Sequence, residues 1–370
     1  MATLSQHLKG YFFVSAFLLS IIGIVFIYSA GTYWGEVHYF GQTPFYIKQA
    51  IYFGVALVCC ITVMNIPAFQ NPKLWAVFYI VSLVLLVAVL IPGIGIVRNG
   101  SQSWIGVGAL TVQPAELAKV TTLTYLSAIL SKRKTYERVV QIRHFAVIFM
   151  PVFLIMLQPD FGAVFILVVV AFILLFIAKY PIRLYVALIV IGMAGLAVLI
   201  AAAPYRLKRI EAFINPWADP LGSGFQAVQS LFAIGPAGLF GHGLLKSRQK
   251  YLYLPEPQND FIFAIILEEI GLVGGLGLLL IFACFLITGY RLALRCNEAF
   301  HFYVICALTT IIAVQACLNV GVVINLLPVT GVTLPFISYG GTSLVVVWLT
   351  VALILNFSSE ERRKNDGKSD

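Results

Sequence analysis

Long apolar runs, separated by short polar segments, follow one another along the chain from its start to about residue 357. Ten of these runs are long enough to cross about 30 Å of hydrocarbon as helices, which takes about 20 residues each. The predicted spans are 11–30, 47–65, 74–92, 113–131, 144–159, 161–178, 184–203, 261–289, 302–325 and 336–357. The pattern predicts an all-α integral membrane protein with about ten transmembrane helices.

The composition supports this class. Of the 370 residues, 61% are hydrophobic and 11% are charged, whereas a soluble domain is about 45–50% apolar and about 25% charged. A water-soluble core cannot enclose so much apolar surface, and a disordered chain would contain far less of it. We expect one membrane domain over residues 1–357, followed by a short polar cytoplasmic tail at 358–370.

Basic residues alternate along the chain in a way that sets the orientation. If the N-terminus lies inside, the inner segments contain fifteen Lys and Arg residues and the short outer loops contain only Arg98. The positive-inside rule then places both termini in the cytoplasm. The net charge of +9 is therefore a sign of topology, and it does not indicate a nucleic-acid partner.

A large outer loop, residues 204–259 between the seventh and eighth helices, departs from this rule. Its basic residues are Arg206, Lys208, Arg209, Lys246, Arg248 and Lys250. Long loops are translocated whatever their charge, so topology does not explain these cations. Within the loop, apolar residues at three-to-four spacing over 225–232 predict a short amphipathic helix in the outer interface.

Ionisable residues inside or at the mouth of a span are costly, which makes them candidates for function. Glu116 and Lys119 are three positions apart on a predicted helix, and a buried ion pair that fixes helix packing is the alternative interpretation. Asp160 and Asp260 each precede a predicted span, where an Asp is also a suitable helix N-cap. For both residues, capping and a role in a site remain open.

Asp260 has two features that favour a site. The rigid segment Pro255-Glu256-Pro257 precedes it, and the basic loop shares its side of the membrane. Counting 100° per residue from Asp260, Glu268 faces the same cavity about 12 Å deeper, whereas Glu269 points toward a neighbouring helix. The six Cys and five His residues show no metal-ligand spacing, so the sequence predicts no metal centre.

Six segments form motifs in a fixed order. They are VRNGSQSWIGVG at 97–108, QPAELAK at 113–119, QPDFG at 158–162, DPLGSGFQ at 219–226, LPEP at 254–257 with Asp260, and LPVTG to SYGG over 327–341. Together they resemble the motifs of the SEDS family (shape, elongation, division and sporulation). The ten predicted spans agree with this resemblance.

The resemblance implies a peptidoglycan glycosyltransferase in the bacterial cytoplasmic membrane. Such proteins polymerise lipid II, an undecaprenyl-diphosphate-linked disaccharide-peptide, at the outer face. They work beside a class B penicillin-binding protein, which is the transpeptidase, and with other divisome or sporulation membrane proteins. The segment 246–257 resembles the FtsW and SpoVE branch more than RodA, which favours septal synthesis. Many members carry an Arg just before the Trp of the first motif, where this chain has Gln102 and Ser103. Arg98 can take the place of that Arg only if the loop that carries it folds back toward Trp104.

The implied reaction joins a sugar 4-hydroxyl to the anomeric carbon of the donor and expels a lipid diphosphate, with inversion. Glycosidases need two carboxylates, but diphosphate is already a good leaving group, so one carboxylate and several cations suffice. Asp260 is the predicted base. The predicted substrate and diphosphate contacts are Lys48, Trp104, Arg206, Lys208, Arg209, Lys246 and Arg248. The predicted supporting residues are Glu116, Lys119, Asp160, Glu256 and Glu268. No cofactor is certain, and a divalent cation, Mg²⁺ or Mn²⁺, remains an open alternative.

Three other functions remain as alternatives. A lipid II flippase would place cations along a path through the bilayer and use helices broken near its midplane, whereas the unexplained cations here lie on one side. A RodA-type polymerase would act in elongation and not at the septum. A scaffold that recruits the penicillin-binding protein would not account for Asp260 among outer cations.

Overall fold

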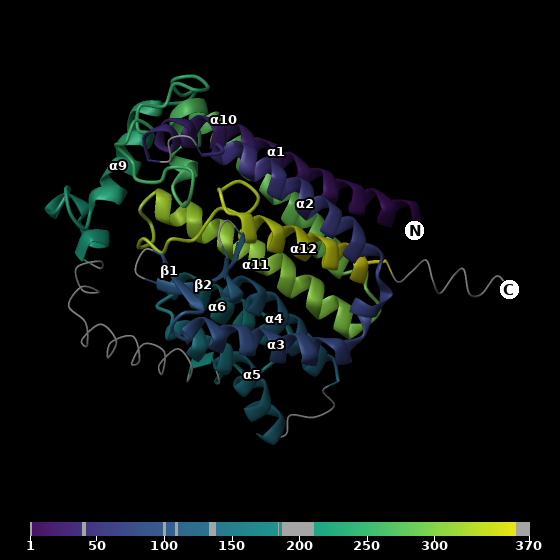
Figure 1. The fold of residues 1–370 in the computed structure, drawn as a ribbon. Helices are drawn as coiled ribbons and strands as arrows, with labels where there is room; N and C mark the ends of the chain where they lie inside the picture. The colour runs from purple at the N-terminus through teal and green to yellow at the C-terminus, as the bar shows by residue number, and fades with distance from the viewer. Residues whose placement is uncertain are drawn as a thin grey trace.

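The structure is a computed structural model, and it describes residues 2–38, 42–98, 101–107, 110–132, 138–183, 185–186 and 211–359. Long helices form a bundle (Figure 1). The long helices are α1 (Ala2–His38), α2 (Phe45–Asn65), α3 (Pro72–Leu90), α4 (Pro114–Ser131), α5 (Arg138–Met156), α6 (Phe161–Ile177), α10 (Ile262–Ala293), α11 (Ala299–Val323) and α12 (Gly341–Phe357). A shorter helix, α9 (Phe225–Ile234), lies in the outer loop.

These nine long helices coincide with nine of the ten predicted spans. The seventh, 184–203, lies outside the described residues apart from residues 185 and 186. By length and composition, α1, α2, α3, α10 and α11 can each cross a membrane, and shorter apolar helices cover residues 143–156, α6 and α12. The chain is therefore a mostly helical, multi-pass membrane protein. The last predicted span begins too early, because residues 336–340 belong to a loop and α12 begins at Gly341.

Helix α11 lies at the centre of the bundle, where it packs against α4, α6, α10 and α12. Around it, α1 packs on α10, α2 on α12, and α3 on α4. The Lys9 ammonium donates a hydrogen bond to the Ser359 hydroxyl at 3.1 Å, so α1 begins where α12 ends. This common end agrees with the prediction that both termini lie on one side of the membrane.

The opposite end of the bundle carries α9 and a small antiparallel sheet (Figure 1). The strands are β1 (Gly95–Arg98), β2 (Ser101–Val107) and β3 (Leu110–Val112), in the order β1-β2-β3. The pattern of apolar runs did not predict this sheet. Helix α9, which it did predict, packs against α10 and α11, and its Ser230 hydroxyl donates to the carbonyl of Val323 at 2.7 Å.

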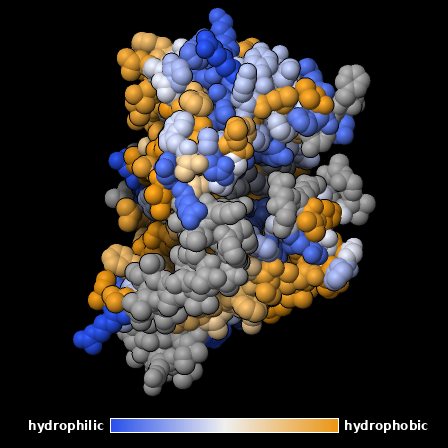
Figure 2. Space-filling view, turned by 90° about the vertical axis from the view of Figure 1, so that its left-hand side faces the viewer, coloured by the Kyte–Doolittle hydropathy of each residue, from blue (hydrophilic) through white to orange (hydrophobic). Residues whose placement is uncertain are grey.

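Hydrophilic and hydrophobic residues interleave on this end of the molecule (Figure 2). In the outer loop, Ile214, Leu221 and Phe240 are 74%, 87% and 76% exposed, and Trp217 packs edge-on against Phe232. Exposed apolar and aromatic side chains are typical of segments at the membrane–water interface. This surface fits the interface, where the short helix over 225–232 was predicted to lie, although α9 is also anchored to the bundle.

Helix α10 is broken at Gly271, whose backbone has φ 67° and ψ −171°. The outer-loop segment 238–243 crosses the break and pairs with its backbone. His242 and Gly243 donate to the carbonyls of Glu268 and Glu269, both at 2.9 Å. Gly238 and Leu239 accept from the amides of residues 272 and 273 at 3.1 and 3.0 Å. The groups freed by the break are thus satisfied inside the protein, as a membrane requires.

Candidate active site

Asp260 stands two residues before α10, in the turn that follows the proline-braced segment. The N-cap of α10 is Phe261, and the cap has no side-chain hydrogen bond. The N-cap alternative for Asp260 is therefore wrong. The expected shared face with Glu268 also fails, because Asp260 precedes the helix and the helical count does not start there.

The Asp260 side chain is half-buried and forms no ion pair with the described residues. Burial raises the pKa of its carboxyl from 3.8 to about 6. A hydrogen bond from its own backbone amide opposes the shift, and the nearby Glu256 carboxylate adds to it. A carboxylate with a pKa near neutrality is suited to take up a proton at the working pH.

Glu256 is held by its neighbour Asn259. The Asn259 side-chain amide donates to Glu256 Oε2 at 2.6 Å, and the Asn259 backbone amide donates to the Glu256 carbonyl at 3.0 Å. Glu256 adopts a positive φ of 43°. The turn 256–259 therefore fixes a second carboxylate close enough to Asp260 to influence its protonation.

A loop from 328 to 340 adjoins Asp260 and is fastened by amide side chains. Asn319 donates to the backbone carbonyls of Asp260 and Val332 at 2.6 and 2.7 Å. Gln315 donates to the carbonyl of Thr333 at 3.2 Å. The Gln49 side chain donates to the carbonyl of Ser338 at 3.1 Å and accepts from the amide of Gly340 at 3.3 Å. These amides were not among the predicted site residues, because an uncharged side chain in a span carries no cost as plain as that of an ionisable one.

Several buried polar atoms of the Asp260 turn, of α11 and of the loop 328–340 lack a hydrogen bond among the described residues. They are Gln258 Oε1, Asn259 Oδ1, Asn319 Oδ1 and Thr330 Oγ1. Gln258 and Asn259 directly precede Asp260 in the chain. Buried polar groups normally have partners. This unused hydrogen-bonding capacity is typical of a site that receives a polar ligand.

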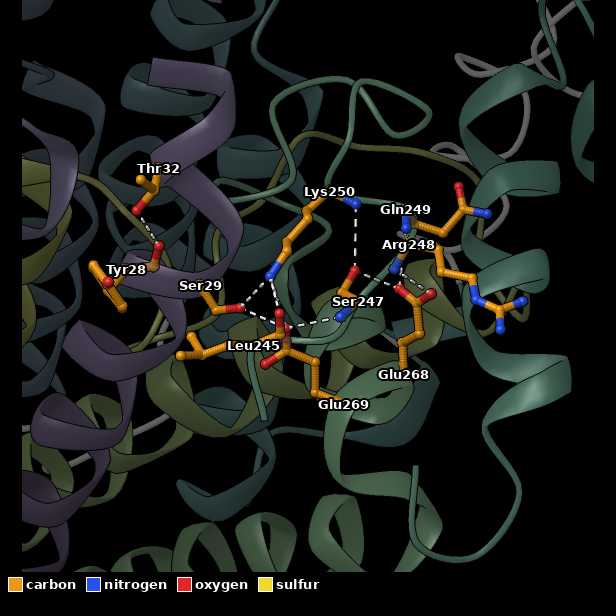
Figure 3. A network of polar contacts seen from close by, with 10 residues as sticks. All are labelled: Tyr28, Ser29, Thr32, Leu245, Ser247, Arg248, Gln249, Lys250, Glu268 and Glu269. Atoms are coloured by element: carbon orange, nitrogen blue, oxygen red, sulfur yellow. Dashed lines mark hydrogen bonds and ion pairs between the residues drawn. The ribbon is translucent and has the colours of Figure 1, made fainter. Parts of the chain in front are cut away.

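Two glutamates of α10 fasten the basic part of the outer loop (Figure 3). Glu268 accepts from the Ser247 hydroxyl at 2.5 Å and from the backbone amides of Arg248 and Gln249 at 2.8 and 3.3 Å. Its side chain is therefore occupied by the loop and does not face Asp260. The predicted supporting role of Glu268 remains a prediction, and its contacts assign it to this loop.

Glu269 accepts from the Ser29 hydroxyl of α1 at 2.5 Å and from the Ser247 backbone amide at 3.2 Å. The expectation that Glu269 meets a neighbouring helix is confirmed. The Lys250 ammonium lies 3.6 Å from Glu269 Oε1, and it donates to Ser29 and to the carbonyl of Leu245 at 3.3 and 2.5 Å. Lys250 is buried, so this cation is part of the scaffold.

The other predicted cations differ from Lys250. Lys246 and Arg248 are exposed, and the Arg248 guanidinium points away from the glutamate network (Figure 3). Lys48, half-buried at the start of α2, lies 6.0 Å from the centre of the Phe45 ring. Arg206, Lys208, Arg209 and the side chain of Arg98 lie outside the described residues. Two exposed cations of the loop thus remain as candidate contacts for an anion.

Glu116 and Lys119 form an ion pair at 2.8 Å, with exposed side-chain fractions of 12% and 2%. Asp160 is the N-cap of α6, where its Oδ1 accepts from the Ala163 amide at 3.0 Å and its Oδ2 from the Gln113 side chain at 2.8 Å. Burial raises the pKa of the Asp160 carboxyl, while the Ala163 amide and the Lys119 cation oppose the shift. The capping alternative holds for Asp160, and the ion pair lies close to it.

Trp104 is half-buried in β2, opposite Ile96 of β1. The sheet also contacts the hairpin before α6, because the hydroxyls of Ser101 and Ser103 both reach the carbonyl of Gln158. Gln102 stands just before the Trp of the first motif, where many members of the resembled family carry an Arg. Its side chain donates to the carbonyl of Val89 at 2.9 Å. The departure from the family pattern thus has a structural use in this chain.

Two further features of the described residues concern metal ligands and a pocket. Among the described residues, no three His, Cys, Asp or Glu side chains gather to hold a metal ion. A groove of about 310 Å³ between α1 and α10 is lined by apolar residues and glycines, among them Ile22, Phe26, Leu244 and Ile270. The groove contains no group for proton transfer, so it is not a second candidate for the active site beside Asp260.

The motifs and the fold point to one family. A family model described as "Cell cycle protein", which covers FtsW, RodA and SpoVE, matches residues 9–363. The chain belongs to this family, the SEDS family. The resemblance carried by the six motifs is therefore confirmed over nearly the whole length of the chain.

Relatives of this SEDS protein cover almost all of it. It is 42% identical over 349 residues to "Stage V sporulation protein E" of Bacillus subtilis (strain 168), which is 93% of this chain and 95% of that protein. It is 37% identical over 358 residues to "Probable peptidoglycan glycosyltransferase FtsW" of Saccharophagus degradans (95% and 92%). Both relatives agree with the predicted FtsW and SpoVE branch.

Solved structures share the fold. A chain from "Structural coordination of polymerization and crosslinking by a peptidoglycan synthase complex" superimposes with a TM-score of 0.79 at 28% identity, over 94% of this chain and 97% of that one. The rod shape determining protein RodA of Thermus thermophilus gives 0.71 at 25% identity, over 94% and 96%. This SEDS chain therefore has the RodA-like fold.

Proposed function

We propose that this protein is a peptidoglycan glycosyltransferase that polymerises lipid II into glycan strands at the outer face of the cytoplasmic membrane. The names of the relatives support the activity, since one is described as a probable peptidoglycan glycosyltransferase. The observation in this chain that carries the proposal is Asp260, a half-buried carboxyl with a pKa of about 6 at the outer mouth of α10.

In the proposed reaction, the acceptor 4-hydroxyl attacks the anomeric carbon of the donor. The new C–O bond forms as the bond to the lipid diphosphate breaks, and Asp260 takes the hydroxyl proton. Attack opposite the leaving group converts an α-linked donor into a β-1,4 product. Gln258 Oε1 and Asn259 Oδ1, the unsatisfied polar atoms directly before Asp260 in the chain, supply hydrogen-bonding capacity for the sugar, and this supports an acceptor bound beside Asp260.

Lys246 and Arg248 are proposed to bind the diphosphate and the charge that develops on it. Their segment is rigid, because Glu268 binds its backbone and the Lys250–Glu269 pair anchors its end. Preorganised cations stabilise a leaving group without reorganising during the reaction. Lys48, Trp104, Arg206, Lys208 and Arg209 remain proposed substrate contacts. A divalent cation, Mg²⁺ or Mn²⁺, remains an alternative that would help these residues hold the diphosphate.

Septal synthesis is the proposed setting, with a class B penicillin-binding protein as partner. The relatives of the FtsW and SpoVE type favour this setting over elongation. The solved structure of a peptidoglycan synthase complex, which combines polymerisation and crosslinking, supports a crosslinking partner. Crosslinking of the membrane proteins in a septating cell, followed by identification of what this chain captures, tests both points.

The flippase alternative gains one argument from the structure, since α10 is broken at Gly271. Transporters line their substrate path with such breaks. Here the outer-loop segment 238–243 pairs with the broken helix through backbone hydrogen bonds, and the buried cation Lys250 is paired with Glu269. The break therefore supports an anchored loop better than a path through the membrane.

The decisive experiment offers lipid II to the purified protein without ATP. We expect glycan polymer, and Asp260→Asn should lower its rate by about 10²–10⁴-fold while lipid II binding is retained. Glu36→Gln is the matched control, because this carboxylate is exposed near the end of α1 and should be silent. A fully active Asp260→Asn protein would contradict the base assignment, and lipid scrambling as the only activity would favour the flippase.

A further inference from the structure

Asn319 joins two segments that lie far apart in the chain. It stands near the end of α11, and its side chain is 1% exposed. Its Nδ2 donates to the backbone carbonyl of Asp260 at 2.6 Å and to the backbone carbonyl of Val332 at 2.7 Å. Both protons of the amide are therefore used, one on the turn before α10 and one on the loop 328–340.

The surroundings of Asp260 make this bond important. Its side chain is neither the cap of α10 nor a member of an ion pair among the described residues. The carbonyl that Asn319 binds is attached to the Cα from which the carboxylate leaves the backbone. A fixed carbonyl therefore limits the direction in which the carboxylate points.

The second bond of Asn319 extends the assembly to α6. Val332 lies against Gly162, since a Cβ on Gly162 would stand 2.5 Å from a methyl of Val332. Gly162 is the second residue of α6, directly after the helix cap Asp160 and Phe161. One amide thus ties Asp260 to the loop that covers the beginning of α6.

Packing alone does not explain an asparagine at this position. Apart from Gln315, the side chains around it on α11 are mostly apolar, and its Oδ1 is buried without a hydrogen bond among the described residues. An unpaired buried acceptor is costly, and polar residues inside a membrane protein tend to serve function. The two donor bonds are therefore the contribution of this side chain.

We infer that Asn319 is the positioning residue that orients Asp260 for proton transfer. The inference rests on the proposed function, in which Asp260 is the base. Asn319 does not touch the substrate in this assignment. It acts through the backbone of Asp260, and its removal should impair the chemical step and leave substrate binding nearly unchanged.

Gln315 is a matched control on the same helix, one turn before Asn319. Its side chain donates to the carbonyl of Thr333 at 3.2 Å, so it fastens the same loop without touching Asp260. If Asn319 mattered only by holding this loop, Gln315→Leu and Asn319→Leu would have similar effects. A larger effect at Asn319 isolates the bond to Asp260.

The experiment compares the full-length purified proteins carrying Asn319→Leu, Asn319→Asp and Gln315→Leu. Asn319→Asp keeps the size and shape of the side chain but can donate at most one hydrogen bond. It provides a second test of the inference if Asn319→Leu does not fold. We expect kcat for lipid II polymerisation to fall by about 10²-fold, because misplacing a reacting group by about 1 Å has this effect. KM should stay within about twofold, and Gln315→Leu should lower kcat far less.

Two further readouts separate positioning from a general structural role. In Asn319→Leu, the acid limb of kcat/KM, set by a pKa of about 6, should move to lower pH, because a displaced Asp260 loses burial; Asn319→Asp is left out of this readout, because its added carboxylate would itself raise the Asp260 pKa. Glu256 is the charged neighbour that acts on this pKa, and it is unchanged in all variants. Hydrogen exchange of the amides at 259–264 should accelerate in the Asn319 variants and not in Gln315→Leu.

The inference is overturned if the Asn319 variants lose no more kcat than Gln315→Leu, if the loss is in KM, or if exchange at 259–264 is unchanged. Failure of the proposed function looks different. In that case the unaltered protein makes no polymer, while the exchange comparison still decides whether Asn319 holds the Asp260 turn.

Discussion

Removing one partner of the Glu116–Lys119 pair should destabilise the fold, and the structure predicts which loss is worse. The two charges lie 2.8 Å apart, and Lys119 is 2% exposed. An uncompensated buried charge costs about 3–5 kcal/mol, whereas an exposed pair contributes only about 0.2–1 kcal/mol. Because the Glu116–Lys119 pair is buried, the larger cost of about 3–5 kcal/mol applies to it.

The two single variants should differ because Asp160 is close. The Lys119 cation opposes the raised pKa of the Asp160 carboxyl. Glu116→Ala therefore leaves Lys119 with one acidic neighbour, while Lys119→Ala leaves two carboxylates without their cation. We expect a loss of about 3–5 kcal/mol for Lys119→Ala and a smaller one for Glu116→Ala. The double variant Glu116→Leu with Lys119→Met should recover much of the stability that either single variant loses.

The assay is equilibrium unfolding of the purified protein in detergent, with membrane yield as a second measure. Lys73→Met is the matched control, since Lys73 is exposed at the start of α3 and should be silent. The argument is refuted if both single variants are as stable as the unaltered protein, or if the double variant is the least stable of the set. Stable single variants without polymerase activity would instead place the pair in the active site.

Three further outcomes follow from the structure. Polymerase activity should fall as the pH drops through about 6, because a protonated Asp260 accepts no proton. Glu256→Gln should move this acid limb of the kcat/KM profile to lower pH, because it removes a negative charge that helps raise the pKa of Asp260. Lys250→Met should destabilise the protein in the unfolding assay by about 3–5 kcal/mol, since its buried glutamate partner keeps an unpaired charge; an unchanged midpoint would refute this. Gly271→Ala should abolish the folded yield on size exclusion, because φ is 67° and the new Cβ would lie 2.4 Å from backbone atoms. Gly277→Ala, where nothing lies within 4 Å, is the control that should fold.

The helices were predictable because one physical constraint governs them. A span must bury its backbone over the thickness of the hydrocarbon, so long apolar runs read directly as helices. The ion pair of Glu116 and Lys119 was predictable for a similar reason, since three positions on a helix bring two side chains together. In both cases the spacing within one segment contains the information.

The break in α10 was not predictable from such local spacing. Gly271 stands in a run that also contains Gly274, Gly275 and Gly277, and nothing in the run distinguishes the first. The outer-loop segment 238–243 distinguishes it, because its backbone pairs with residues on both sides of Gly271. A long-range contact therefore decides where the helix opens.

The basic loop shows how far this limit reaches into the site. Lys246, Arg248 and Lys250 alternate in the sequence and appear equivalent as ligands for an anion. In the structure the three cations differ. Lys250 is buried and pairs with Glu269 of α10, whereas Lys246 and Arg248 are exposed. Lys250 was not among the predicted diphosphate contacts, although the sequence offers no structural reason for the difference. Its burial supplies the reason: Lys250 anchors the segment from which Lys246 and Arg248, the proposed diphosphate contacts, extend, so its own role is in the scaffold.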